Sequence, residues 1–424
     1  MRKLFLSIIA LTLGIGAWAQ ETQSVDYIDA DGQQKTATAT VVTDETETLS
    51  AGWYVVTGEV LRASITCNGD VHLILADGAK LTARGGEGQA AITVSGDGNS
   101  LTIYGQAAQS GQLIATGGKY AAGIGGGDEG SSFNITINGG TVTSTGGMYA
   151  AGIGGGNDGS GSNITINGGV VTANSGAAGA GIGGGNDGSG SNITINGGVV
   201  TANNEFGGAG IGGGLQGDGS NITINGGVVT ANSEWEGAGI GGGNGGSGSN
   251  ITINGGEVTA SGGNNGAGIG AGIGGGDGGS GSNIRIAFEL AVYADNQNPP
   301  TTEIPHAIGY DIAQYLNGRQ YVIVKDVITG LKSDAIAAIN AAISDTDNDN
   351  VKAIAANAET AINAATSIHE IDAIKTQAIA AIASAKAILG PLGEEHPGPA
   401  VKVTKGDTEV ILYLPDKVEY IIRK

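Results

Sequence analysis

Apolar and polar residues alternate with a period of two through the middle of the chain. Residues 164–166 read Ile-Thr-Ile and residues 171–173 read Val-Thr-Ala, so that successive side chains point to opposite faces of a strand. Asparagine and glycine follow these short segments, as they do at turns. The pattern predicts short β-strands joined by tight turns.

Two strings of residues repeat this pattern at a fixed interval. Ala-Gly-Ile-Gly-Gly-Gly begins at residues 122, 151, 180, 209, 238 and 271, so the spacing is 29 residues four times and then 33. Asn-Ile-Thr-Ile recurs with the same spacing, and a duplicated Ala-Gly-Ile-Gly at residues 267–270 accounts for the longer interval. Strands this short cannot fold alone, but stacked copies pair ~4.8 Å apart. We therefore expect a mainly β fold, a parallel β-helix (solenoid) with 29-residue coils.

Stacking of similar coils also predicts columns of identical residues. Ile135 and its counterparts in the next coils form an inward column that is entirely isoleucine. One corner carries asparagine in five successive coils, and side-chain amides stacked at this spacing are expected to form a hydrogen-bonded ladder. These residues are Asn138, Asn167, Asn196, Asn225 and Asn254.

The chain changes character on both sides of the repeat coils, which occupy residues 122–290. Residues 20–121 contain less regular strands and are expected to form the N-terminal cap and irregular first coils, while residues 291–330 form the opposite cap. In residues 331–390 alanine and isoleucine recur at helical spacing, which predicts a small three-helix module. Residues 391–424 are expected to form a linker and a short β segment.

The first 19 residues are typical of a signal peptide. Arg2 and Lys3 precede a mostly apolar run at residues 4–15, and the small-residue site Ala-Trp-Ala follows at residues 17–19. The run is too short to span a bilayer, and no other stretch approaches the ~20 apolar residues that a spanning helix needs. We expect an exported protein without a transmembrane segment, located at the cell surface, in the periplasm or secreted.

Composition and net charge exclude several classes of protein and of binding partner. The chain has 424 residues, of which 82 are glycine and only 7 are proline, and there is no Gly-X-Y period, so it is not collagen. Its net charge of -21 repels phosphate groups, which argues against nucleic acid as a partner. The content of 40% hydrophobic and 14% charged residues argues against a disordered chain.

Three segments before the repeats carry a resemblance to a family. Residues 49–56 read Leu-Ser-Ala-Gly-Trp-Tyr-Val-Val, residues 69–78 read Gly-Asp-Val-His-Leu-Ile-Leu-Ala-Asp-Gly, and residues 99–106 read Asn-Ser-Leu-Thr-Ile-Tyr-Gly-Gln. Followed by AGIGGG and ITINGG units, they make residues 22–325 resemble the glycine-rich repeat exported surface proteins of gut and oral bacteria. The resemblance implies a right-handed, pectin-lyase-like solenoid, sometimes grouped with carbohydrate-binding domains, and it supplies no catalytic residues.

The repeat coils lack the side chains of a polysaccharide lyase. No lysine, arginine or histidine lies between Tyr120 and Asn283, whereas lyase chemistry needs a base. Hydrolysis needs paired carboxylates, but most carboxylates of the coils recur in loop positions and do not converge. We therefore expect no lyase or hydrolase and no catalytic residues. An enzyme whose site lies near Arg62, His72 and Arg84 is the enzymatic alternative.

Aspartate turns such as Asp158 raise the question of calcium. Each coil carries about one carboxylate at this turn, whereas calcium takes six to eight oxygen ligands. We expect no cofactor and no metal site, with calcium as the alternative that the sequence leaves open.

Aromatic residues stand just before the glycine string in four of five coils. They are Tyr120, Tyr149, Phe206 and Trp235, and Ala178 occupies the third coil. Stacked coils would set the rings in one row ~5 Å apart, offering apolar faces to sugar rings. Hydrogen-bonding groups beside this row would come from Glu205, Glu234, Asn203, Asn204 and Asn232. The structural alternative is that each ring only covers its own glycine-rich loop.

Two functional classes follow from this pattern. The first is a non-catalytic carbohydrate-binding surface protein whose partner is a polysaccharide or other glycan and whose site is formed by the aromatic residues. The second is a structural stalk or adhesin that binds a host or bacterial surface protein.

Overall fold

A computed structural model describes residues 21–263, 271–287, 290–304, 311–344, 349–365, 368–389, 400–405 and 408–413. The expected signal peptide lies outside the described residues. The chain divides into two compact units. The first contains Met1–Arg285, Ala294–Thr302 and Tyr310–Ile323, and the second contains Ile286–Tyr293, Glu303–Gly309 and Val324–Lys424.

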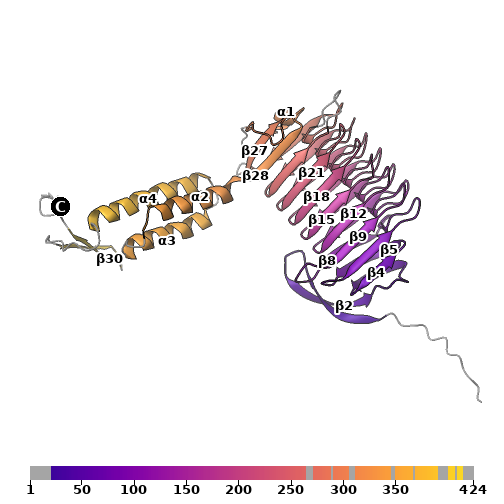
Figure 1. The fold of residues 1–424 in the computed structure, drawn as a ribbon, viewed down its shortest axis with the longest axis horizontal. Helices are drawn as coiled ribbons and strands as arrows, with labels where there is room; N and C mark the ends of the chain where they lie inside the picture. Colours follow the sequence, from indigo (N-terminus) through magenta and orange to yellow (C-terminus); the bar gives the residue numbers. More distant parts are fainter. Residues whose placement is uncertain are drawn as a thin grey trace, which may run out of the picture. The chain divides into compact units, whose positions relative to one another are not determined.

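The first unit is a parallel β-solenoid (Figure 1). Each repeat coil contributes three strands, and each strand pairs in parallel with its counterpart in the next coil. Ile153 pairs with Ile182, and Ile164 pairs with Ile193, so the register advances by 29 residues per coil. The mainly β solenoid and the coil length expected from the repeat are confirmed.

The strands form three columns. The first contains β7 (Ile92–Thr93), β10 (Ile124–Gly125), β13 (Ile153–Gly154), β16 (Ile182–Gly183), β19 (Ile211–Gly212), β22 (Ile240–Gly241) and β25 (Ile273–Gly274). The second contains β3 (Thr48–Val56), β5 (Ile65–Leu75), β8 (Ser100–Gly105), β11 (Ser132–Ile137), β14 (Gly161–Ile166), β17 (Gly190–Ile195), β20 (Gly219–Ile224), β23 (Gly248–Ile253) and β26 (Gly281–Ile286). The third contains β4 (Glu59–Arg62), β6 (Lys80–Arg84), β9 (Gln112–Thr116), β12 (Thr141–Thr145), β15 (Val170–Asn174), β18 (Val199–Asn204), β21 (Val228–Ser233) and β24 (Glu257–Ser261).

The interior of the solenoid is formed by the predicted apolar columns. Ile135 and Ile164 are fully buried, as are their counterparts along the second column. The glycine string is required where coils touch: Gly183 has a φ of +135°, and a Cβ there would lie 2.0 Å from the carbonyl oxygen of Gly212. Only glycine fits this conformation and this close approach.

Asparagine ladders connect the coils along the outside. The predicted ladder is confirmed, since the Asn167 side chain donates a hydrogen bond to Asn138 at 2.7 Å and the pattern continues to Asn254. Two further ladders were not predicted. One begins with Asn163 donating to Asn134 at 3.1 Å, and the other comprises Asn174, Asn203 and Asn232.

Less regular structure precedes and follows the repeat coils. Before them, strands β1 (Thr22–Ile28) and β2 (Gln34–Val41) form an antiparallel hairpin whose Tyr27 ring lies 4.7 Å from the Trp53 ring. After them, helix α1 (Ala313–Leu316) follows Asp311, whose carboxylate accepts hydrogen bonds from the backbone N–H groups of Asn283 and Ile284, both at 2.8 Å. The division of the chain into two units falls within strands β27 (Leu290–Asp295) and β28 (Tyr321–Asp326).

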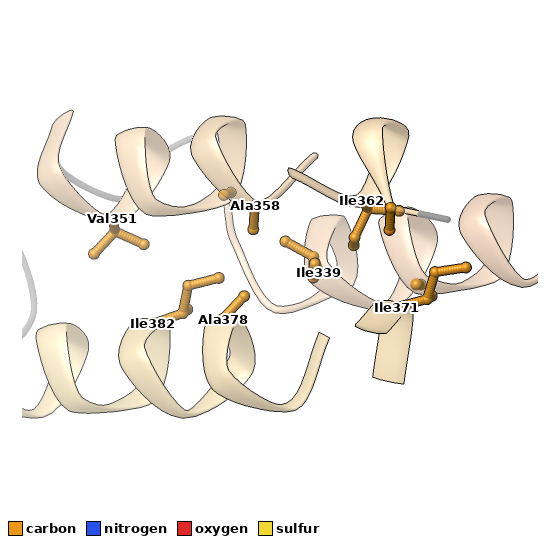
Figure 2. Close-up of a cluster of buried hydrophobic side chains, with 10 residues drawn as sticks. Ile339, Val351, Ala358, Ile362, Ile371, Ala378 and Ile382 are labelled. Atoms are coloured by element: carbon orange, nitrogen blue, oxygen red, sulfur yellow. The ribbon is translucent and has the colours of Figure 1, made fainter. Parts of the chain in front are cut away.

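The second unit contains the three predicted helices, α2 (Val327–Ala341), α3 (Asp349–Ala364) and α4 (Ile368–Leu389). Figure 2 shows apolar side chains from all three helices pointing toward one another, among them Ile339, Ile362 and Ile382, which are at most 1% exposed. After the helices, β29 (Ala400–Lys405) and β30 (Thr408–Tyr413) pair in antiparallel register. Within the described ranges, no helix has both the length and the apolar character that crossing a membrane requires.

Candidate functional site

The four aromatic residues predicted to bind a ligand form two close pairs, one stacked and one tilted. The rings of Tyr120 and Tyr149 are nearly parallel, with centroids 5.9 Å apart and an interplanar angle of 5°. Those of Phe206 and Trp235 are 4.7 Å apart and tilted by 40°. Phe206 is 44% exposed and Trp235 is 40% exposed, so both rings of the second pair present surface to solvent.

The expectation that all four rings share one row is wrong, because Phe206 and Trp235 are offset by one residue of register from Tyr120 and Tyr149. The carbonyl groups of Tyr120, Tyr149, Ala178 and Gly207 each accept a hydrogen bond from the turn of the following coil, so these four positions are equivalent. Phe206 stands one residue before the last of them, and its counterparts in earlier coils are Lys119, Met148 and Ala177.

Buried polar side chains hold the loops that carry Phe206 and Trp235. Asn204, at the end of β18, donates from Nδ2 to Ser175 Oγ at 3.0 Å and to the carbonyl oxygen of Gly179 at 2.7 Å. Ser233, at the end of β21, donates from Oγ to the carbonyl oxygen of Gly208 at 2.9 Å. These bonds connect each loop to the preceding coil, so they fix the backbone that carries Phe206 and Trp235.

A polar groove of about 680 Å³ lies beside these loops. Its floor and walls include the Asn174–Asn203–Asn232 ladder, and the two carboxylates in its lining, Glu205 and Glu234, directly precede Phe206 and Trp235. The residues that carry the rings are therefore chain neighbours of the lining, although Phe206 and Trp235 are not themselves among the lining residues. The lining consists of Asn174, Ser175, Asn203, Asn204, Glu205, Asn232, Ser233, Glu234, Ser261, Gly262, Asn298, Gln320 and Tyr321.

The sequence pattern indicated only part of this lining. It indicated Glu205, Glu234 and three asparagines, Asn203, Asn204 and Asn232, and the structure groups these polar residues in one lining. It missed Asn298, Gln320 and Tyr321, which come from the segment after the repeats. No repeat spacing relates these residues to the coils, so the sequence held no pattern that could have found them.

The other aromatic pair has a different chemical character. The Lys119 ammonium lies 4.7 Å from the centroid of the Tyr120 ring. A hydrogen bond with the Tyr120 side chain raises the pKa of Lys119 above its ordinary value. The Tyr120–Tyr149 pair therefore stands beside a positive charge, whereas Phe206 and Trp235 stand beside carboxylates.

The residues of the enzymatic alternative lie on two different columns. Arg62 and Arg84 are on β4 and β6 of the third column, whereas His72 is on β5 of the second. The imidazole of His72 stacks on Trp53 with centroids 4.3 Å apart and shares a 3.1 Å hydrogen bond with the hydroxyl of Tyr104. His72 thus takes part in the packing of the N-terminal aromatic cluster.

The aspartate turns are linked by amides along the coils. Asp158 accepts hydrogen bonds from the side chains of Asn157 at 3.2 Å and Asn186 at 3.4 Å. In the part of the chain that the structure describes, no three histidine, cysteine or acidic side chains gather as a metal site would require. The calcium alternative stays a prediction.

Comparison with known proteins agrees with the architecture. Six segments match the Beta helix repeat family, at residues 110–128, 135–157, 164–186, 193–215, 222–244 and 251–277. Neither the curated proteins nor the solved structures contain a match. Together, the repeat matches and the solenoid support a pectin-lyase-like β-helix repeat protein.

Proposed function

We propose that this chain is an exported surface protein that binds a polysaccharide or other glycan without cleaving it. The observation that carries the proposal is the close, partly exposed pair Phe206–Trp235, whose chain neighbours Glu205 and Glu234 line a groove together with amides and hydroxyls. Exposed aromatic faces pack on the apolar faces of sugar rings, and convergent polar groups fix the orientation of a ligand.

The chemistry of the groove favours binding over cleavage. Among the described residues, its lining includes two carboxylates but no lysine, arginine or histidine. The carboxylates also occupy equivalent positions of adjacent coils, whereas glycosidases hold two carboxylates that flank the scissile bond. Tyr120 and Tyr149 would provide a second contact for a long chain.

A pull-down on insoluble cellulose, chitin and xylan tests the proposal. The Phe206→Ala/Trp235→Ala variant should lose retention, because truncation removes both ring faces, and Tyr120→Ala/Tyr149→Ala should weaken it. Leu61→Ala serves as the control, since Leu61 is an exposed apolar residue (64%) of the solenoid that does not line the groove.

Each outcome has a separate meaning. Unchanged retention of the Phe206→Ala/Trp235→Ala variant, with the circular dichroism of the wild type, contradicts the site. Absence of retention on every glycan contradicts glycan binding and favours a stalk or adhesin with a protein partner. Release of reducing or unsaturated sugars contradicts the non-catalytic assignment.

A further inference from the structure

The two carboxylates of the groove occur only where the aromatic pair occurs. Glu205 and Glu234 are equivalent residues of adjacent coils, and the same position is glycine in the coils before and after them, at Gly147, Gly176 and Gly263. Both carboxylates are exposed, and the coil rise places their backbones ~4.8 Å apart. Like charges at this spacing repel, so a cation between them is favoured.

A second observation in the same groove is independent of these charges. Asn204 is only 1% exposed and lines the groove, and its Oδ1 atom has no hydrogen-bond partner. The Nδ2 atom makes the contacts with Ser175 Oγ and with the carbonyl groups of Ala177 and Gly179, so the unpartnered atom is the acceptor. A buried acceptor without a donor costs free energy, and a ligand donor would remove that cost.

The groove therefore offers acceptors and negative charge to a ligand. The described lining has no cationic side chain to neutralise Glu205 and Glu234. Aromatic faces attract cations as well as sugar rings, and hydrogen bonds between ammonium and carboxylate are stronger than neutral ones. A ligand that combines a sugar ring with an ammonium group would satisfy all of these features.

We propose that the groove selects glycans that carry protonated amines, that is, deacetylated amino sugars, over neutral and acidic glycans. The inference rests on the proposed glycan-binding function and adds the chemical class of the ligand. In this arrangement the sugar rings pack on Phe206 and Trp235, and their ammonium groups donate to Glu205 and Glu234.

The test compares two soluble probes by titration calorimetry with the full chain. One is a β-1,4-linked glucosamine oligosaccharide, and the other is its fully N-acetylated counterpart of the same length. The amine form should bind wild type about tenfold more tightly, as expected for two exposed ion pairs. The Glu205→Gln/Glu234→Gln variant should lose this preference while keeping its affinity for the acetylated probe.

A matched control separates the groove from the general charge of the protein. Asp158 and Asp187 are also equivalent residues of adjacent coils, lie outside the groove lining and have positive φ values of 57° and 54°, which asparagine tolerates. The Asp158→Asn/Asp187→Asn variant makes the same charge change and should keep the preference. Raising the pH until the amines of the probe are neutral should abolish the preference in wild type.

The outcomes distinguish the two proposals. The amine selectivity is overturned if wild type binds both probes with equal affinity. Glycan binding is still supported in that case if the Phe206→Ala/Trp235→Ala variant binds neither probe. An equal loss of preference in the glutamine variant and the asparagine control also overturns it, because the effect is then long-range charge. Failure to bind either probe overturns the selectivity, and the insoluble-glycan experiment then decides glycan binding by itself.

Discussion

Replacement of Gly183 by alanine should destabilise the solenoid far more than an ordinary surface substitution. Gly183 has a φ of +135°, and an added Cβ would meet the carbonyl oxygen of Gly212 at 2.0 Å. That oxygen also accepts a hydrogen bond from the backbone N–H of Gly184 at 2.9 Å. Relief of the clash therefore has to move the backbone that joins two coils.

The size of the effect follows from three contributions. An alanine held in this backbone region costs about 1–3 kcal/mol, and overpacking at the coil contact costs about 1–3 kcal/mol more. The smaller entropy of the unfolded chain returns about 0.4–1 kcal/mol. We expect a net loss of about 1–6 kcal/mol in the free energy of unfolding of the solenoid.

Urea unfolding followed by tryptophan fluorescence measures this loss, because Trp53 and Trp235 both lie in the solenoid. The control is Gly58→Ala, where an added Cβ has no atom within 4 Å and φ is ordinary for alanine. The midpoint of Gly183→Ala should fall well below that of Gly58→Ala. Equal midpoints would refute the close approach of the coils at the glycine string.

Three further predictions concern the whole solenoid and two of its residues. Deletion of residues 151–179, one complete coil, should leave a folded protein, whereas deletion of about half that length should not, because each coil contacts only its neighbours; circular dichroism of the two proteins distinguishes these results. Burial raises the pKa of the Cys67 thiol to about 12, so a thiol reagent at neutral pH should label it only at the rate at which the solenoid opens. Backbone N–H groups of Thr301 and Gln297 lower the pKa of Asp295 to about 2, so its contribution to stability is complete above pH ~4 and is lost as the pH falls toward 2. Asp295→Asn should therefore show a smaller loss of stability than wild type between these pH values.

The solenoid was predictable from the repeat because the interval between coils and the residue types at each position both require stacking in register. A fixed interval of 29 residues places like residues above one another, and an all-isoleucine column such as that of Ile164 satisfies burial only if the coils stack in register. The Asn138 ladder follows from the same spacing. The Asn134 and Asn174 ladders could have been predicted in the same way, since their residues also recur at 29-residue spacing.

The candidate site was predictable only in part. A shift of one residue in register places an aromatic residue in a different stacked position from coil to coil. Phe206 and Trp235 precede the glycine string at nearly the same distance as Tyr149, yet the 29-residue register aligns them with Met148. The strings already contain this offset, since Tyr149 stands two residues and Phe206 three residues before the alanine of the glycine string, and the hydrogen bonds of the turn carbonyls confirm it. Gln320 and Tyr321 reach the groove through the path of the chain after the last coil, which follows no repeat.

Departures from the repeat are therefore the informative positions in this protein. Residues that recur in every coil are explained by stacking: glycine by close backbone contact, isoleucine by burial and asparagine by ladders. Stacking does not explain why two adjacent coils replace Gly176 and Ala177 with Glu205 and Phe206, and then with Glu234 and Trp235. These replacements put two like charges and two exposed rings on neighbouring coils. The exposed rings lower solubility and the like charges repel one another, while neither adds to the core. Such a cost is retained where a ligand offsets it, so the groove beside these four residues is the place on the solenoid where function should be sought.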